Sequence, residues 1–379
     1  MIIGVPREIK THEYRVGMTP TGVAELSREG HGILVEAGAG EGSGFADDDF
    51  HRSGARVVSR SDLFGRAELI VKVKEPLPEE YGLLQPGQTL FTYLHLAPNE
   101  ALTRVLLERG ITAIGYETLE KGGVLPLLAP MSEIAGRMAP LVGAFHLQRI
   151  YGGTGTLPAG VPGVAAGRAL ILGAGVVGSA ASRVCLGLGM ETTVMNRGIE
   201  RLQRLDDVFN GRLRTLVLTA DALADHLRDA DLVVGALLVP GGRTPVLITR
   251  PMLGTMRKGA VIVDVAVDQG GCVATSRPTT HDKPVYEVDG IIHYTVANMP
   301  GAYPRTSTLA LTNATLPYVR LLASLGIEDA LRRDPALAKA SIPGGAASFT
   351  GPWPKPSGCP AFPLPDSGPT RAGACLLLP

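Results

Sequence analysis

Four polar side chains fall at or just beyond the ends of predicted strands, where open α/β sheets bind their ligands. They are Arg15 after the first strand, Lys74 in ELIVKVK, His95 in TLFTYLHL and Asp268 in AVIVDVAVD. An arginine can hold a carboxylate through two parallel hydrogen bonds. A lysine can neutralise charge that develops on a carbonyl oxygen, and a histidine suits reversible proton transfer near neutral pH. Together these residue types could bind a small acid and move protons on it.

Each of these residues also has a purely structural alternative. Arg15 could be an ordinary surface arginine, and Asp268 could cap the turn that follows it. Lys72 and Lys74 share one strand face, so both could be lysines of an edge strand whose charged ends reach solvent. His95 could be a core imidazole bonded to backbone. The sequence leaves these alternatives open.

The elements that must position such a site centre on residues 167–198, GRALILGAGVVGSAASRVCLGLGMETTVMNRG. An apolar run predicts a buried strand and meets three glycines in GxGxxG spacing, Gly173, Gly175 and Gly178. A helix of small residues and a second strand complete the βαβ unit in which this spacing is specific. The stretch therefore predicts dinucleotide binding at a helix N-terminus rather than an ordinary glycine turn. Beside a bound nicotinamide, which would accept the hydride, the four polar residues would suit the oxidation of a small amino or hydroxy acid.

Composition limits the class of protein. The 379 residues are 45% hydrophobic and 19% charged, which predicts a globular protein of two domains. The net charge of zero gives no indication of a nucleic-acid or membrane partner. The N-terminus lacks a signal peptide, no run suits a membrane helix, and the four cysteines form no CxxC pair or zinc pattern. We therefore expect a cytoplasmic protein without a bound metal, in which Cys185 is a buried thiol.

The order of apolar runs predicts an α/β fold with two Rossmann-like, doubly wound domains joined by long helices, the first domain being discontinuous. The substrate domain is expected at 1–127 plus 303–340, and the dinucleotide-binding domain at 128–302. A second glycine-rich stretch, residues 36–45, is expected to be a strand-to-helix turn, because the acidic residues within and after it would repel phosphate. Residues 341–379 are rich in proline and glycine and are expected to be disordered.

Five motifs of the sequence are distinctive: VKVKEP (71–76), FTYLHLA (91–97), PLLAPMSEIAGRMA (126–139), VDVAVDQGGC (263–272) and VANMPGAYPRTST (296–308). Together they closely resemble the alanine dehydrogenase family, which shares its fold with the N-terminal domain of transhydrogenase. The resemblance runs from Met1 to about Lys339. It implies a usually hexameric bacterial enzyme that interconverts L-alanine with pyruvate and ammonium, using NAD.

The resemblance also implies roles for individual residues. Arg15 and Lys74 would bind the substrate carboxylate and carbonyl, His95 would be the acid–base group, and Asp268 would face the reacting carbon. Lys74 is also counted as catalytic, and which of His95 and Lys74 carries the main proton is left open. The positions that match cofactor contacts are Ser132, Gly173, Gly175, Val176, Val177, Gly178, Asn196, Arg197, Val239, Asp268, Asn298 and Met299.

The sequence departs from the family in two places. The second Rossmann strand usually ends in Asp but here ends in Asn196 and Arg197, so we expect NAD to be used and NADP to be accepted more readily. The family's ordered C-terminus is replaced beyond Ala340 by the Pro/Gly-rich tail. The alternative function is a non-catalytic NAD-binding module of a transhydrogenase-like complex, which would not need both Lys74 and His95.

Overall fold

The computed structural model describes residues 1–96, 99–239 and 243–342. The chain forms two compact units. The first contains Met1–Lys10, Val16–Leu125 and the described residues from Thr315 onward, and the second contains Thr11–Arg15 and Pro126–Ala314. Each unit holds its own seven-stranded sheet flanked by helices, so the predicted α/β class with two Rossmann-like units is confirmed. The short segment with Arg15 belongs to the second unit, although the predicted substrate domain included it.

The sheet of the first unit has the order β14-β6-β5-β4-β1-β2-β3. Its six parallel strands are β1 (Ile2–Val5), β2 (Gly32–Glu36), β3 (Arg56–Val58), β4 (Leu69–Val71), β5 (Thr89–Thr92) and β6 (Thr112–Gly115). The seventh, β14 (Ser341–Ile342), pairs antiparallel with β6. The prediction that residues 341–379 are disordered is therefore wrong for Ser341 and Ile342, because their backbone forms the edge strand of the sheet. The rest of that tail lies outside the described residues.

The first five helices of the first unit follow its strands in the usual α/β alternation, and two more precede β14. They are α1 (Pro20–Arg28), α2 (Asp47–Arg52), α3 (Arg60–Arg66), α4 (Pro78–Tyr81), α5 (Glu100–Glu108), α12 (Ile327–Arg333) and α13 (Pro335–Lys339). The Thr19 and Asn99 side chains cap the N-termini of α1 and α5. Buried residues of α3 and α5, such as Leu63 and Leu102, join strand residues such as Leu90 in one hydrophobic core.

The glycine-rich stretch at residues 36–45 connects β2 to α2. The backbone N–H of Gly38 donates to both carboxylate oxygens of Asp47, at 2.9 and 3.2 Å. The Gly38 N–H is thus already bonded to the Asp47 carboxylate, so it is not available to bind a phosphate. The stretch is a strand-to-helix connection, as predicted.

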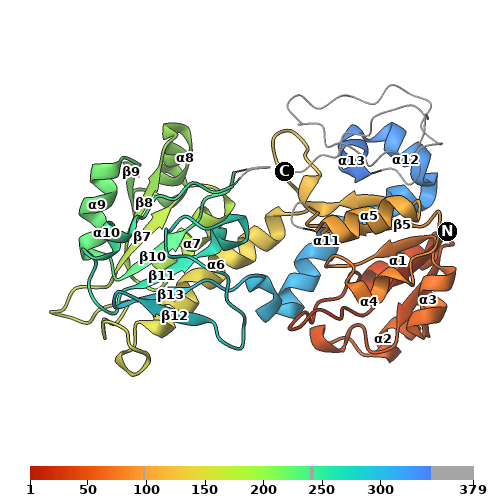
Figure 1. The fold of residues 1–379 in the computed structure, drawn as a ribbon, viewed down its shortest axis with the longest axis horizontal. Coiled ribbons are helices and arrows are strands. Elements are labelled where there is room, and N and C mark those ends of the chain that lie inside the picture. Colours follow the sequence, from red (N-terminus) through yellow and green to blue (C-terminus); the bar gives the residue numbers. More distant parts are fainter. Residues whose placement is uncertain (97–98, 240–242, 343–379) are drawn as a thin grey trace. The chain divides into compact units, whose positions relative to one another are not determined.

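The sheet of the second unit has the order β12-β13-β11-β10-β7-β8-β9, and its strands lie side by side in Figure 1. Its six parallel strands are β7 (Arg168–Leu172), β8 (Glu191–Asn196), β9 (Arg214–Val217), β10 (Leu232–Gly235), β11 (Val261–Asp264) and β13 (Ile291–Tyr294). The seventh strand, β12 (Val285–Val288), is antiparallel and lies at the sheet edge. It joins β13 through the Asp289-Gly290 pair, which forms a hairpin turn with positive φ at both residues.

Helices cover both faces of this second sheet, which makes it doubly wound. The helices α6 (Ala129–His146), α7 (Val176–Gly187) and α8 (Ile199–Phe209) contribute to one hydrophobic core with alternate strand residues. The opposite core contains residues of α9 (Ala220–Asp229) and α10 (Arg250–Leu253). Cys185 and Cys272 are fully buried in these cores, and burial raises the pKa of the Cys185 thiol to about 12.

The last long helix, α11 (Pro304–Leu325), contains residues of both units. Within the described part of the chain, no helix is both long enough and apolar enough to span a membrane.

Candidate active site

The glycine fingerprint has the close contacts that its spacing predicts. Helix α7 begins directly after Gly175. A Cβ added to Gly178 would lie 1.8 Å from the Gly173 carbonyl oxygen, so α7 can approach β7 this closely only with glycine there. Gly173 has a φ of 113°, and a Cβ there would lie 2.6 Å from the carbonyl oxygen of Ala236. These glycines bring the N-terminus of α7 against the strand ends, where its unpaired N–H groups can bind phosphate.

Helix α6 packs closely on α7 through a further glycine. A Cβ on Gly136 would lie 2.4 Å from the carbonyl oxygen of Val177 and 2.8 Å from the Ala180 side chain. This contact explains the run of small residues in α7. Ser132, one turn before Gly136, is half-buried near the start of α6.

Asn196 and Arg197, the two residues predicted to decide between NAD and NADP, have different environments. The Asn196 side chain accepts from the backbone N–H of Ala174 (3.2 Å) and donates to the Gly198 carbonyl (2.9 Å), so it braces the glycine turn. Arg197 is exposed. Arg201, which sequence reasoning missed, is the side chain nearest to Gly175, with Nη1 3.9 Å from the position of an added Cβ. Its position in the first turn of the helix after β8 was the signal that could have found it.

The strand that was expected to end at Asp268 ends at Asp264 instead, which corrects the prediction. The buried Asp264 carboxylate accepts from the backbone N–H groups of Ala266 (3.1 Å) and Cys272 (2.9 Å) and from the Ser276 hydroxyl (2.5 Å). Asp264 is thus the residue that caps the following turn. Asp268 lies in the short 3₁₀ helix Val265–Gln269 and is exposed, on a loop that Asp264 holds at both ends.

Arg15 is a buried residue of the second unit and not a surface arginine. Its Nε and Nη2 donate to the two carboxylate oxygens of Glu13, at 2.6 and 2.5 Å, and Nη2 also donates to Asn298 Oδ1 at 2.7 Å. The Asn298 amide donates in turn to Glu13 (2.9 Å), and Asn298 has a left-handed φ of 63°. Met299 follows with 3% exposure. The Arg15 charge is therefore balanced within the unit, and its planar group is held by two neighbours.

Lys74 and His95 meet in the first unit. Each lies three residues beyond the last residue of its strand, β4 or β5, and these strands are parallel neighbours. Lys74 Nζ is 3.3 Å from His95 Nε2, and the Tyr93 ring is stacked 6.0 Å from the imidazole. His95 is exposed, so the core-imidazole alternative is wrong. The two basic nitrogens are therefore close enough to form a hydrogen bond with each other.

Lys72 has a structural role that separates it from Lys74. It is fully buried, and its Nζ contacts the carboxylates of Glu8 (3.1 Å) and Glu80 (2.9 Å). Burial alone would lower the pKa of Lys72, but the two carboxylates raise it above its ordinary value. Strand β4 lies inside the sheet, so the edge-strand alternative is wrong for both lysines. Glu8 also accepts from the backbone N–H groups of Val73 (2.6 Å) and Lys74 (3.2 Å).

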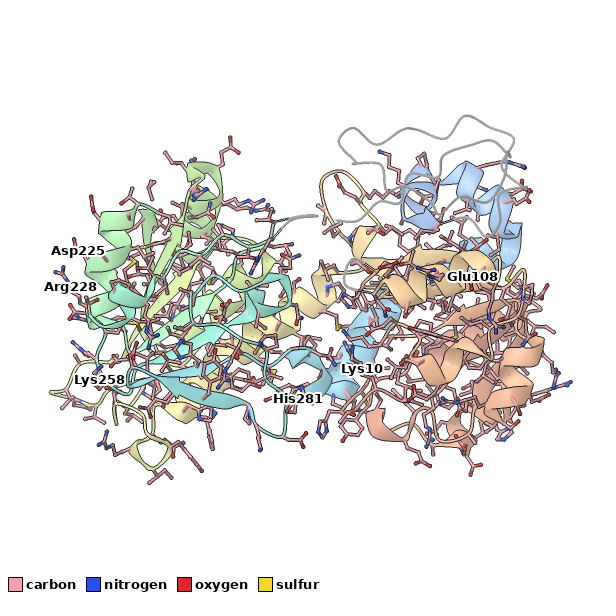
Figure 2. All side chains as sticks on the ribbon, in the orientation of Figure 1. Lys10, Glu108, Asp225, Arg228, Lys258 and His281 are labelled. Atoms are coloured by element: carbon pink, nitrogen blue, oxygen red, sulfur yellow. The ribbon has the colours of Figure 1, made fainter. Side chains whose placement is uncertain are left out.

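A second carboxylate adds negative charge beside Lys74. Lys10, labelled in Figure 2, donates to Glu75 Oε1 at 2.5 Å. Burial opposes ionisation of Glu75, but the Lys10 hydrogen bond and the charge of Lys74 together lower the pKa of Glu75. The ionised Glu75 therefore favours a positive charge on the Lys74–His95 pair.

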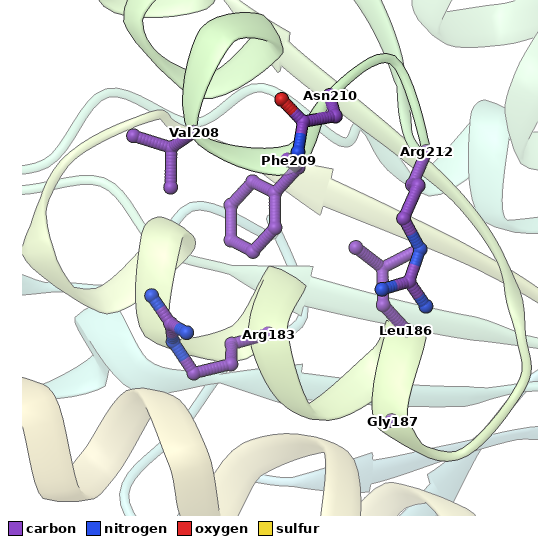
Figure 3. A pocket seen from close by; sticks show the side chains of 7 residues that line it. All are labelled: Arg183, Leu186, Gly187, Val208, Phe209, Asn210 and Arg212. Atoms are coloured by element: carbon purple, nitrogen blue, oxygen red, sulfur yellow. The ribbon is translucent and has the colours of Figure 1, made fainter.

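The second unit contains a cavity of its own. Figure 3 shows its lining at the C-terminal ends of α7 and α8, with the Arg183 guanidinium 5.5 Å over the Phe209 ring. The glycine fingerprint is at the opposite end of α7, about 16 Å away at 1.5 Å per helical residue. Arginines at helix C-termini complement the exposed carbonyl groups. We assign the cavity no part in dinucleotide binding.

Two family models match adjoining parts of the chain. The model "Alanine dehydrogenase/PNT, N-terminal domain" matches residues 4–135, and "Alanine dehydrogenase/PNT, C-terminal domain" matches residues 139–345. The chain belongs to this family. The resemblance inferred from the sequence motifs is thereby confirmed.

Individual relatives agree with the family assignment. The chain is 57% identical over 337 residues to an alanine dehydrogenase of Halomonas elongata, covering 88% of this chain and 91% of the relative. It is 50% identical to the enzyme of the same name from Bacillus subtilis, covering 89% of each. Among solved structures, an L-alanine dehydrogenase matches with a TM-score of 0.88 and 50% identity, covering 91% of this chain and 96% of that one. A transhydrogenase from Sinorhizobium meliloti matches with a TM-score of 0.76 and 25% identity, covering 85% and 94%.

Proposed function

We propose that this protein is an L-alanine dehydrogenase, which converts L-alanine and NAD reversibly into pyruvate, ammonium and NADH. The observation that carries the proposal is the pair of basic nitrogens of Lys74 and His95, 3.3 Å apart, in a chain that also holds a complete dinucleotide fingerprint. A bound nicotinamide would supply the hydride acceptor that this reaction needs. The glycine contacts fit that cofactor, since a Cβ at Gly178 would push α7 away from the turn.

The charged residues have distinct roles in the proposed reaction. Arg15, held by Glu13 and Asn298, and Lys74 bind the substrate carboxylate and carbonyl. Loss of a proton from the ammonium group and of a hydride from the α-carbon of alanine, the hydride passing to the nicotinamide, would leave a protonated imine, to which water adds. The carbinolamine then collapses to pyruvate and ammonium. Asp268 orients the water or ammonia in this sequence.

Proton transfer is assigned to the Lys74–His95 pair. A proton leaves the attacking water and another must reach the departing nitrogen, so the group involved has to accept and return protons. A contact of 3.3 Å lets either nitrogen take the proton while the other accepts a hydrogen bond from it. Glu75 supports the protonated form of the pair by its charge.

The alternative, a non-catalytic transhydrogenase-like module, is less well supported, because the matching transhydrogenase is 25% identical to this chain and the matching L-alanine dehydrogenase is 50% identical. The two functions differ in a simple assay. NADH absorbance at 340 nm should fall when pyruvate and ammonium are both present and stay constant when either is omitted. A module that only exchanges hydride between nucleotides would consume NADH only after a second nucleotide is added.

We also propose that the protein assembles with copies of itself. Large apolar side chains are exposed on α6 and the loop after it, including Phe145 (48% exposed), Ile150 (79%) and Tyr151 (45%). Phe145 and Tyr151 stack with ring centres 4.5 Å apart, which makes a continuous apolar surface. Light scattering after gel filtration should give about six times the chain mass if the family's hexamer forms. A monomer at micromolar concentration would contradict this proposal.

NADP acceptance is a further part of the proposal. Asn196 carries no charge to repel a 2′-phosphate, and Arg197 and Arg201 add positive charge on the segment after β8. We expect Asn196→Asp to lower NADP turnover at least about tenfold relative to NAD turnover, because a repulsive contact of ~1.4 kcal/mol is a factor of ten. Asn210→Asp, which adds the same charge at the far end of α8, is the control. Absence of any NADP-dependent activity in the parent protein would contradict the inference.

A further inference from the structure

One carboxylate beside the Lys74–His95 pair has no place in the reaction described above. Glu117 lies in the short 3₁₀ helix Tyr116–Thr118, directly after β6. We propose that Glu117 is a positioning residue, which holds the backbone at His95 so that the imidazole meets Lys74. The inference rests on the proposed function of His95.

The hydrogen bonds of Glu117 continue the sheet beyond its last backbone pair. The parallel ladder of β5 and β6 ends where Thr92 is opposite Gly115. Two residues further on, the backbone N–H groups point to the Glu117 side chain and not to another strand. His95 N–H donates to Oε1 at 2.7 Å, and Leu94 N–H donates to Oε1 and Oε2 at 3.1 and 3.2 Å. The carboxylate thus replaces the missing strand at this point.

The backbone of His95 needs such support. Its φ is 46°, in the left-handed region that a residue with a Cβ adopts only at a cost of about 1–2 kcal/mol. Glu117 is half-buried, and this burial raises its pKa even though the N–H groups of Glu117, His95 and Leu94 favour the charged form. The hydrogen bonds from Leu94 and His95 therefore hold the backbone of the loop where His95 has its left-handed φ.

The neighbouring strand end has a comparable arrangement. Glu8 accepts from the backbone N–H groups of Val73 and Lys74, just beyond β4. The backbone at Lys74 is therefore held by Glu8, and the backbone at His95 is held by Glu117. Glu8 also pairs with the buried Lys72, so its replacement would disturb the core as well. Glu117 is the better residue for testing the positioning role.

Two substitutions at position 117 separate the acceptor from the charge. Glu117→Ala removes the acceptor, and we expect kcat for alanine oxidation to fall about tenfold while KM for alanine changes less than about threefold. Glu117→Gln retains one oxygen that can accept from both N–H groups, and its kcat should stay within about threefold of the parent. Glu120→Ala, at an exposed position three residues later, is the matched control and should leave kcat unchanged.

The deciding experiment combines Glu117→Ala with His95→Ala. If Glu117 acts only through His95, the double variant should be no slower than His95→Ala alone. A further loss of about tenfold in the double variant, or a parental kcat for Glu117→Ala, would overturn the proposal. A His95→Ala variant with parental kcat would instead refute the proposed function of His95. NADH binding, measured for every variant by fluorescence, identifies any variant that has failed to fold.

Discussion

Lys74→Ala and His95→Ala should each lower turnover of alanine by at least about 100-fold, while the dissociation constant of NADH stays nearly unchanged. The physical reason is the loss of positioned charge stabilisation or of proton transfer, each of which contributes a factor of about 10² or more. Neither residue is among the predicted cofactor contacts, so we expect nucleotide binding to change little. Steady-state kinetics with alanine and NAD, together with NADH fluorescence titration, would measure both quantities.

The matched control for these variants is Lys121→Ala, at an exposed lysine of the same unit. Its turnover should equal that of the parent. If either Lys74→Ala or His95→Ala retains turnover within threefold of the parent, that residue has no part in the mechanism. A rise in the NADH dissociation constant as large as the loss of turnover would also contradict the assignment, because the defect would then be in binding.

Replacement of Lys72 by methionine should have the largest effect on stability, lowering the free energy of unfolding by about 3–5 kcal/mol. The change leaves the buried carboxylates of Glu8 and Glu80 without their shared cation, and removal of one partner of a buried ion pair costs this much. The pKa of Lys72 is raised in the folded state, so the pair stabilises fully below the unfolded lysine pKa of about 10.4. This stabilisation is lost as the pH rises through the folded value.

Thermal unfolding of Lys72→Met and of the exposed control Lys121→Met would test this prediction at pH 7. For a unit of this size, each kcal/mol lowers Tm by about 2–4 °C. Adding Glu8→Gln and Glu80→Gln to Lys72→Met should recover part of the loss, because no buried charge then remains unpaired. A Tm within 2 °C of the parent for the single variant would show that Lys72 contributes little to the stability of this unit.

Much of the candidate site followed from local sequence signals. The fingerprint glycines were predictable because their roles depend on close backbone contacts between consecutive elements. Lys74 and His95 could be placed together because they end neighbouring apolar runs, and parallel strands bring their carboxyl ends to one edge. The sequence could not show that Lys72, two residues before Lys74, is buried against Glu8 and Glu80. That pairing depends on segments 64 and 8 residues away.

The remaining differences come from interactions between distant segments. The apolar run VDVAVD predicts a strand that continues past Asp264, because nothing local shows that the Asp264 carboxylate accepts from Cys272 and Ser276 and ends the strand early. Arg15 was assigned with its sequence neighbours, but its guanidinium is bonded to Asn298, 283 residues later. Edge strand β14 is only two residues long, too short to give a period-two pattern. Such features require the tertiary structure.

The most direct test of the proposed function is the fate of the hydrogen on the α-carbon of L-alanine. The protein would be incubated with NAD and L-alanine carrying deuterium at that carbon, and the reduced cofactor would be analysed by mass spectrometry. Direct hydride transfer predicts one deuterium in each NADH formed and a matching amount of pyruvate. Unlabelled NADH, or no NADH in the absence of a second nucleotide, would contradict the proposal that this chain is an alanine dehydrogenase.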